Sequence, residues 1–222
     1  MIESTLVSVD VLALRFDPTA RAVLLGIAPR ALEPFAGELA LPGVLLGRGE
    51  RLRDAARRAV TGKLGVPEEA ITASGQLTTF DEPSRDPRGP TLSIALWATV
   101  DPARLAGDGP TWTPLADVPP LAFDHDRIVR DCRPLLADHL WRDTAFTAGL
   151  LGREFTTAQA LDVTESLTGD RPYPANLGRT MERVPGLERT TQHAAALPKG
   201  GRPPSVWRWT APDLPRPHQD TT

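Results

Sequence analysis

The sequence predicts an α/β protein in which a mixed-sheet α/β/α sandwich over residues 1–140 precedes a smaller helical unit over 144–210. Strand patterns lie on both sides of one early helix, which favours a mixed sheet covered by helices. From residue 144 onward, short helical patterns replace the long strands. The chain of 222 residues is also long enough for two domains of unequal size.

Composition narrows the class of protein. Charged residues make up 24% and hydrophobic residues 41% of the chain, as is usual for globular proteins. No uncharged apolar run reaches the roughly 18 residues that a membrane helix needs, and the N-terminus lacks the pattern of a signal peptide. The single cysteine, Cys132, cannot form an internal disulfide. A cytoplasmic location is therefore expected.

The first region begins with a predicted hairpin, because strand patterns at 8–14 and 22–27 flank the Asp17-Pro18 turn. A helix follows at 51–64, with Leu52, Ala55, Ala56, Ala59, Val60 and Leu64 as its apolar face. Two further strands are expected at 71–80 and 91–100, on either side of a polar loop. Residues 110–120 hold four prolines and indicate a connecting loop.

A helix over 124–140 is expected to bridge the two domains. Asp124 is placed to cap its N-terminus with a side-chain oxygen. Pro134 lies inside this segment, so a kink or a restart is expected there.

The second region has the proportions of a helix-turn-helix. After a first helix at 144–151, helices at 157–168 and 174–184 are separated by a short turn. On the last helix, Asn176, Arg179, Thr180 and Arg183 share one side at helical spacing, while Leu177, Met181 and Val184 share the other. Strands at 187–192 and 205–209 then form a hairpin, the wing, and residues 211–222 form a Pro-rich tail that is expected to be disordered.

Charge distribution favours an anionic partner for this second region. The net charge of the whole chain is −3, yet residues 170–210 carry seven arginines and lysines against three acids. A local basic excess of this kind suits a phosphate-bearing partner. An ordinary solvated face, or a small helical domain that contacts another protein, remains an alternative.

The segment around the early helix resembles the Nudix box, a glycine-rich loop and a helix that end in Arg-Glu-aliphatic-x-Glu-Glu-x-Gly-aliphatic. Leu41-Pro42-Gly43 precedes it as the family expects. The matching positions are Glu50, Arg58, Val60, Gly65 and Val66. The departures are Val44 in place of Gly, and Ala59, Gly62 and Lys63 in place of the glutamates.

These departures remove the chemistry that the resemblance implies. Nudix hydrolases hold Mg²⁺ on a diphosphate with glutamates of this helix, and magnesium needs hard oxygen ligands. Ala59 and Gly62 offer no ligand, and Lys63 places a positive charge there instead. We therefore expect no metal site, no catalytic residue and no hydrolysis.

Two further segments resemble Nudix proteins that bind ADP-ribose and similar nucleotides. The loop Asp81–Gly89 is similar to their D-x-x-R-D-P-R-G motif, with one residue more between Asp81 and Arg85, and the segment Arg30–Gly37 is similar to R-x-x-E-P-F-x-G. Arginine forks suit diphosphates, although Arg–Asp pairs that staple the loop are the plain alternative. The residues that the resemblance assigns to the nucleotide are Arg30, Phe35, Glu50, Arg58, Phe80, Asp81, Arg85, Asp86 and Arg88.

The whole arrangement resembles the Nudix-related transcriptional regulators, on the added strength of Leu121–His125 and Glu154–Thr157. The resemblance implies a repressor of genes of NAD metabolism that binds an inverted-repeat operator in double-stranded DNA as a homodimer, responds to a nucleotide such as ADP-ribose and needs no cofactor. Gly178 departs from the usual basic recognition helix. The expected DNA-contacting residues are Thr156, Thr157, Asn176, Arg179, Thr180, Arg183, Lys199 and Arg202.

Two other functions remain open from the sequence. A divergent Nudix hydrolase could recruit carboxylates from elsewhere, for example Glu50 with Asp81. A nucleotide sensor could also act on a protein partner rather than on DNA.

Overall fold

The structure, a computed structural model, describes residues 5–105, 111–193 and 205–210. Its strands are β1 (Leu6–Asp17), β2 (Ala22–Pro29), β3 (Leu39–Ala40), β4 (Gly43–Leu45), β5 (Ile71–Phe80), β6 (Thr91–Val100), β7 (Thr111–Pro114), β8 (Glu154–Thr156), β9 (Leu187–His193) and β10 (Ser205–Trp209). Its α-helices are α1 (Leu52–Leu64), α2 (His125–His139), α3 (Thr144–Leu151), α4 (Thr157–Thr168) and α5 (Pro174–Met181), and short 3-10 turns lie at Glu68–Ala70 and Pro102–Arg104. Within these residues, no helix has the length and apolar character to cross a membrane.

The large sheet is mixed. Within the described residues it has the strand order β3-β2-β1-β6-β5, with β4 added on β1 and β7 on β2. Strands β1 and β2 form the predicted antiparallel hairpin, and β1 pairs with β6 in parallel. Strand β6 is buried over most of its length because it lies between β1 and β5 in this sheet.

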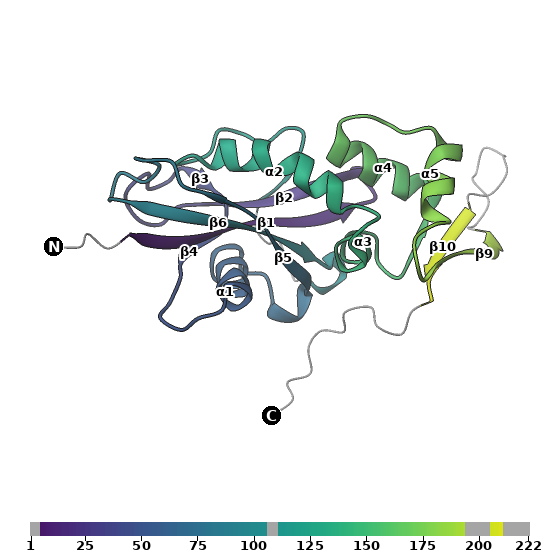
Figure 1. Cartoon of the computed structure of the whole chain (residues 1–222), viewed down its shortest axis with the longest axis horizontal. Helices are drawn as coiled ribbons and strands as arrows, with labels where there is room; N and C mark the ends of the chain where they lie inside the picture. The colour runs from purple at the N-terminus through teal and green to yellow at the C-terminus, as the bar shows by residue number, and fades with distance from the viewer. Residues whose placement is uncertain (1–4, 106–110, 194–204, 211–222) are drawn as a thin grey trace, which may run out of the picture.

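Helices cover both faces of the sheet, which makes the predicted α/β/α sandwich (Figure 1). Helix α1 packs on one face through an apolar cluster that contains Ala55, Ala59 and Val60. Helices α2 and α3 cover the other face, where a second cluster contains Ile128, Leu136 and many sheet residues. The fold class predicted from the sequence is confirmed.

The C-terminal part holds the helix-turn-helix and the wing. Helices α3 and α4 have the predicted bounds, whereas α5 ends at Met181, three residues earlier than predicted. Strand β10 lies between β9 and β8, and β8 was not expected. The loop of the wing and the tail 211–222 lie outside the described residues.

Three other expectations need correction. Strands β4 and β7 lie where the sequence predicts loops, because strands of three or four residues are recognisable only from the partner they pair with. Of the kink or restart expected at Pro134, the restart is wrong, because α2 continues through this residue. Asp124 stands at the N-cap of α2, but its carboxylate makes no capping hydrogen bond, because Arg85 binds it instead.

The two parts of the chain share one apolar core. Helix α3 packs against β1, β5 and β6 and also against α4. A single cluster of buried side chains runs from Leu12 in β1 through Phe146 in α3 to Trp209 in β10. Gly149 permits the close approach of α3 to the sheet, since a Cβ there would lie 2.1 Å from the hydroxyl of Thr99.

Candidate functional site

Helix α1 keeps the shape of the Nudix helix without its acids. It ends on Gly65, whose left-handed φ of 65° suits glycine. Ala59 is fully buried in the apolar cluster under the helix. Gly62 and Lys63 are exposed, and nothing lies within 4 Å of where a Cβ on Gly62 would be.

Glu50, the first acid of the motif, is held by protein groups. Arg58 donates from Nε to Oε1 at 2.9 Å and from Nη2 to Oε2 at 2.8 Å, and the backbone N–H of Gly47 donates to Oε2 at 2.7 Å. The bond from Arg58, followed by that from Gly47, lowers the pKa of Glu50 to about 2. The Glu50–Arg58 pair thus closes the loop that leads into α1.

Three of the predicted nucleotide residues meet in a cation–aromatic cluster around Phe123, which the sequence did not assign to the site. The rings of Phe35 and Phe123 touch edge to face, with centroids 4.8 Å apart. The guanidinium of Arg30 lies 4.4 Å from the centroid of Phe123, and that of Arg88 lies 5.7 Å from it. Both phenylalanines have positive φ, 68° and 59°, which is a strained backbone for a bulky residue.

The electrostatics of this cluster favour an anion. Burial lowers the pKa of Arg30, and the like charge of Arg88 lowers it further. Arg88 pairs with the buried carboxylate of Asp86, and that bond lowers the pKa of Asp86. The Arg88 side chain is still 45% exposed. An anionic group beside Arg30 and Arg88 would relieve the repulsion between the two guanidiniums.

Arg85 differs from Arg88 of the same loop, and it does not have the exposed position expected of a residue that contacts a nucleotide. Its side chain is 4% exposed and forms a two-point contact with Asp124, at 3.0 and 2.7 Å, and an ion pair with Asp10 at 3.5 Å. The guanidinium therefore points into the protein and ties the loop 81–90 to β1 and to the start of α2. The physical reason is the pair of carboxylates beneath the loop, which would otherwise be buried without a counter-charge.

Asp10 is the centre of this buried polar network. Ser93 donates to it at 2.5 Å, Ser8 at 3.1 Å, and Nε2 of His125 lies 3.6 Å away. Burial alone would raise the pKa of Asp10, but the hydrogen bond with His125, with help from Ser93 and Arg85, lowers it to about 2. Nδ1 of His125 accepts from the backbone N–H of Leu41 at 3.0 Å, which leaves Nε2 to carry the proton toward Asp10.

The remaining predicted nucleotide residues lie around the same loop. Phe80 is buried, with Arg127 over its ring. Asp81 lines a hollow of about 570 Å³ beneath the loop 81–92, together with Glu82 and Asp86. No hydrogen bond or ion pair between described residues joins Glu50 or Arg58 to the cation–aromatic cluster.

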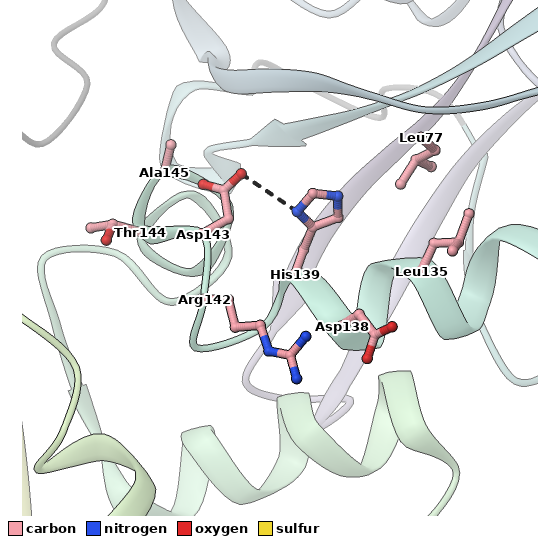
Figure 2. A pocket seen from close by; sticks show the side chains of 8 residues that line it. All are labelled: Leu77, Leu135, Asp138, His139, Arg142, Asp143, Thr144 and Ala145. Carbon is pink, nitrogen blue, oxygen red and sulfur yellow. Dashed lines mark ion pairs between the residues drawn. The ribbon is translucent and has the colours of Figure 1, made fainter.

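A larger hollow, of about 720 Å³, lies at the joint between α2, α3 and β5 (Figure 2). Nδ1 of His139 lies 3.6 Å from the Asp143 carboxylate there, and Asp143 also caps α3. None of the predicted nucleotide residues lines this hollow. Its lining carries Asp138 and Asp143 but also Arg142 and His139, so its charge does not mark it as a phosphate site.

Helix α5 presents the surface that the sequence predicted. Its buried side is made by Leu177 and Met181, with Val184 just beyond. The predicted outward residues are all exposed, namely Asn176, Arg179, Thr180 and Arg183. Arg179 donates to the Asn176 side chain at 3.1 Å, and within the described part of the chain neither Arg179 nor Arg183 forms an ion pair.

The other residues expected to contact DNA have different positions. Thr156 closes a capping box with Gln159 at the start of α4, and the hydroxyl of Thr157 accepts from the indole of Trp207 at 3.0 Å. Both hydroxyls are thus engaged within the protein. Lys199 and Arg202 lie outside the described residues.

The fold and the site define a class of protein, a Nudix-like domain without the metal-binding glutamates that is joined through one core to a winged helix-turn-helix. No family profile matches the chain. In fold and in the order of its parts, the chain matches the Nudix-related transcriptional regulators.

The structural likeness runs over nearly the whole chain. The crystal structure of NrtR from Shewanella oneidensis superposes with a TM-score of 0.74 at 25% identity, over 95% of this chain and 96% of that one. NrtR complexed with a 27mer DNA gives 0.72 at 24% identity, over 91% and 93%. The Nudix domain of NrtR complexed with ADP ribose gives 0.52 at 28% identity, over 61% and 90%.

One curated relative is an enzyme. The ADP-ribose pyrophosphatase of Methanocaldococcus jannaschii is 34% identical over 106 residues, which are 46% of this chain. The match spans 61% of the length of that enzyme.

Phe123 and Asp10 were missed as site residues. Asp10 carried a signal, since it is a lone acid in the middle of an apolar strand pattern. For Phe123, the only signal in the sequence was its position just before α2, because the sequence does not reveal that a phenylalanine has a left-handed backbone.

Proposed function

We propose that this protein is a DNA-binding transcriptional regulator whose Nudix-like domain senses a nucleotide such as ADP-ribose. The observation that carries the proposal is the outward face of α5. That face is polar and basic, free of ion pairs among the described residues, and displayed by the second helix of a helix-turn-helix. Such a helix enters the major groove and reads base edges with its N-terminal residues.

The cation–aromatic cluster supports a nucleotide as the effector. Arg30 and Arg88 offer two guanidiniums to a diphosphate, and Phe35 and Phe123 offer aromatic surface to a base. The likeness to an NrtR Nudix domain that was crystallised with ADP ribose is consistent with this assignment.

A homodimer acting as a repressor on an inverted repeat fits the proposal. Two copies would place two α5 helices on one face of the duplex, with half-sites separated by about one or two helical turns. The domain boundaries we propose are 1–140 for the sensor and 144–210 for the DNA-binding domain.

Hydrolysis is the competing function, and the curated pyrophosphatase relative favours it. The residues of the Nudix-like helix argue against it. Ala59, Gly62 and Lys63 supply no oxygen ligand, and Glu50 is bound by Arg58. We infer that the chain does not turn over ADP-ribose, and incubation with Mg²⁺ or Mn²⁺ should show less than roughly 1 s⁻¹, the low end for enzymes.

The test selects duplexes from a random-sequence pool with the purified full chain and titrates the best one with and without ADP-ribose. We expect an enriched inverted repeat whose affinity changes when ADP-ribose is added. Enrichment of no sequence, with only weak and salt-sensitive binding to every duplex, would instead favour a nucleotide sensor that acts on a protein partner.

A further inference from the structure

Helix α2 joins the cation–aromatic cluster directly to the helix-turn-helix. Phe123 of the cluster lies two residues before the helix, and Asp124, bound by Arg85, is its N-cap. The 15 residues of α2 make a rod of about 22 Å. Arginines tie this rod to other elements at its N-cap and near its middle.

The middle of α2 caps α4, through the ninth of the 15 residues of α2. Arg133 donates from Nη2 to the carbonyl of Ser166 at 2.8 Å and from Nε to that of Leu167 at 3.2 Å. These carbonyls belong to the last turn of α4, where they have no partner within the helix. The last turn of α4 has no basic residue of its own, so Arg133 supplies the cationic cap from a neighbouring helix.

A second tie holds α4 to the sheet. Arg21, in the turn between β1 and β2, donates from Nε and Nη2 to Asp162 at 3.1 and 2.9 Å, and Asp162 is buried. The hydroxyl of Ser166 also accepts from the backbone N–H of Val23 in β2 at 3.1 Å. Helix α4 is therefore fixed to the sheet through the side chains of Asp162 and Ser166, and to α2 through the carbonyls of Ser166 and Leu167.

These contacts of α4 come from two different elements, the sheet and α2. A movement of α2 relative to the sheet therefore changes the position of α4. Phe123 is the residue where such a movement can start, because its left-handed backbone is strained and its ring is held by Phe35 and Arg30. A ligand that replaces these ring contacts favours another position of Phe123 and of the helix that follows it. Helix α5 packs on α4, so a movement of α4 changes the position of α5 as well.

We propose that Arg133 is the positioning residue that transmits the state of the nucleotide site to α5 by carrying the movement of α2 to the C-terminal carbonyls of α4. The proposal rests on the proposed function, since it concerns how the nucleotide changes DNA binding. It concerns neither the binding of the nucleotide nor the chemistry of the DNA surface.

The experiment is hydrogen–deuterium exchange on the full chain with and without ADP-ribose. In the wild type, we expect ADP-ribose to change exchange at 121–128 and also at 157–181. In Arg133→Ala, the change at 121–128 should remain and the change at 157–181 should disappear. Arg133→Lys, which retains a cation for the carbonyls, should restore part of it.

Arg130→Ala is the matched control. Arg130 lies on the same helix, is exposed, and pairs only with the neighbouring Asp131 in the described structure. It should behave as the wild type does. Melting curves of all variants establish that the chain is folded, and calorimetry should give the same affinity for ADP-ribose in Arg133→Ala and in the wild type.

DNA binding gives the second readout, on a duplex that the wild type selects from a random pool. ADP-ribose should change the wild-type affinity by about fivefold or more, the lower range of allosteric coupling, and should change that of Arg133→Ala by less than about twofold. A merely structural role of Arg133 would lower affinity with and without nucleotide alike.

Three results would overturn the inference, and each differs from the others. A change at 157–181 that persists in Arg133→Ala means that coupling takes another route. A wild-type change confined to 121–128 means that the nucleotide does not reach α5, although sensing stands. No change anywhere, with no calorimetric binding, removes the sensing function itself and this inference with it.

Discussion

The loop 81–90 and helix α5 both carry arginines that look alike in the sequence, and they use them in different ways. In the loop, Arg85 is buried against two carboxylates, and Arg88 three residues later is half exposed beside an aromatic ring. In the α5 region, Arg179 and Arg183 both face outward and form no ion pair within the described residues. An arginine held by buried acids contributes to the fold, whereas one left to solvent is available to a partner.

The largest effect should come from the buried arginine. Arg85→Ala leaves Asp10 and Asp124 without their counter-charge, so it should reduce the free energy of unfolding by about 3–5 kcal/mol, the range for breaking a buried ion pair. Denaturant unfolding measures it. Arg53→Ala, whose ion pair with Asp54 is about half exposed on both sides, is the control and should cost less than about 1 kcal/mol. Equal losses in the two variants would remove the distinction between them.

The dependence of stability on acid pH tests the buried network around Asp10. The Asp10 carboxyl is protonated less readily in the folded chain, where its pKa is about 2, than in the unfolded chain, where the ordinary value is 3.8. The resulting stabilisation, about 2 kcal/mol, is complete above about pH 3.8 and is lost as the pH falls through about 2. Denaturant unfolding between these pH values should show this loss in the wild type and a shallower slope in Asp10→Asn. Parallel slopes would contradict the assignment.

Nucleotide affinity tests the half-exposed arginine. Arg88→Ala should weaken ADP-ribose binding by about 1.5–3 kcal/mol, the range for a hydrogen bond to a charged group, with the fold intact. Calorimetry measures it, and Arg53→Ala, on α1 and paired only with Asp54 in the described structure, is the control. Unchanged affinity in Arg88→Ala would place the nucleotide away from the cation–aromatic cluster.

DNA affinity tests the outward face of α5. Arg179→Ala should cost about 1–3 kcal/mol per half-site and relax the preference at one base pair, because Arg179 is placed to reach base edges. Lys199→Ala, in the loop of the wing, should weaken binding to all sequences alike and lower the salt slope by about one unit. Titrations against selected and scrambled duplexes at several salt concentrations distinguish the two. If both variants bind as the wild type does, α5 is not the recognition helix.

The contrast between loop and helix also explains what the sequence could predict. Helical periodicity says which side of a helix is buried, so the two faces of α5 and the apolar face of α1 were predicted correctly, apart from Leu52, which is only partly buried. A loop has no period, so nothing in the sequence separated Arg85 from Arg88. Their difference depends on Asp10 and Asp124, which lie far away in the chain and meet Arg85 only after folding.

The shared core has a consequence for how the protein can be divided. Because helix α3 packs against the sheet on one side and against α4 on the other, cutting the chain near residue 143 would expose apolar surface on both fragments. The two parts should therefore melt in a single cooperative transition. A DNA-binding domain taken from another regulator would need a first helix that approaches Thr99 as closely as α3 does at Gly149. Changes of operator in such a chain are more readily made by altering the exposed side chains of α5 than by exchanging the domain.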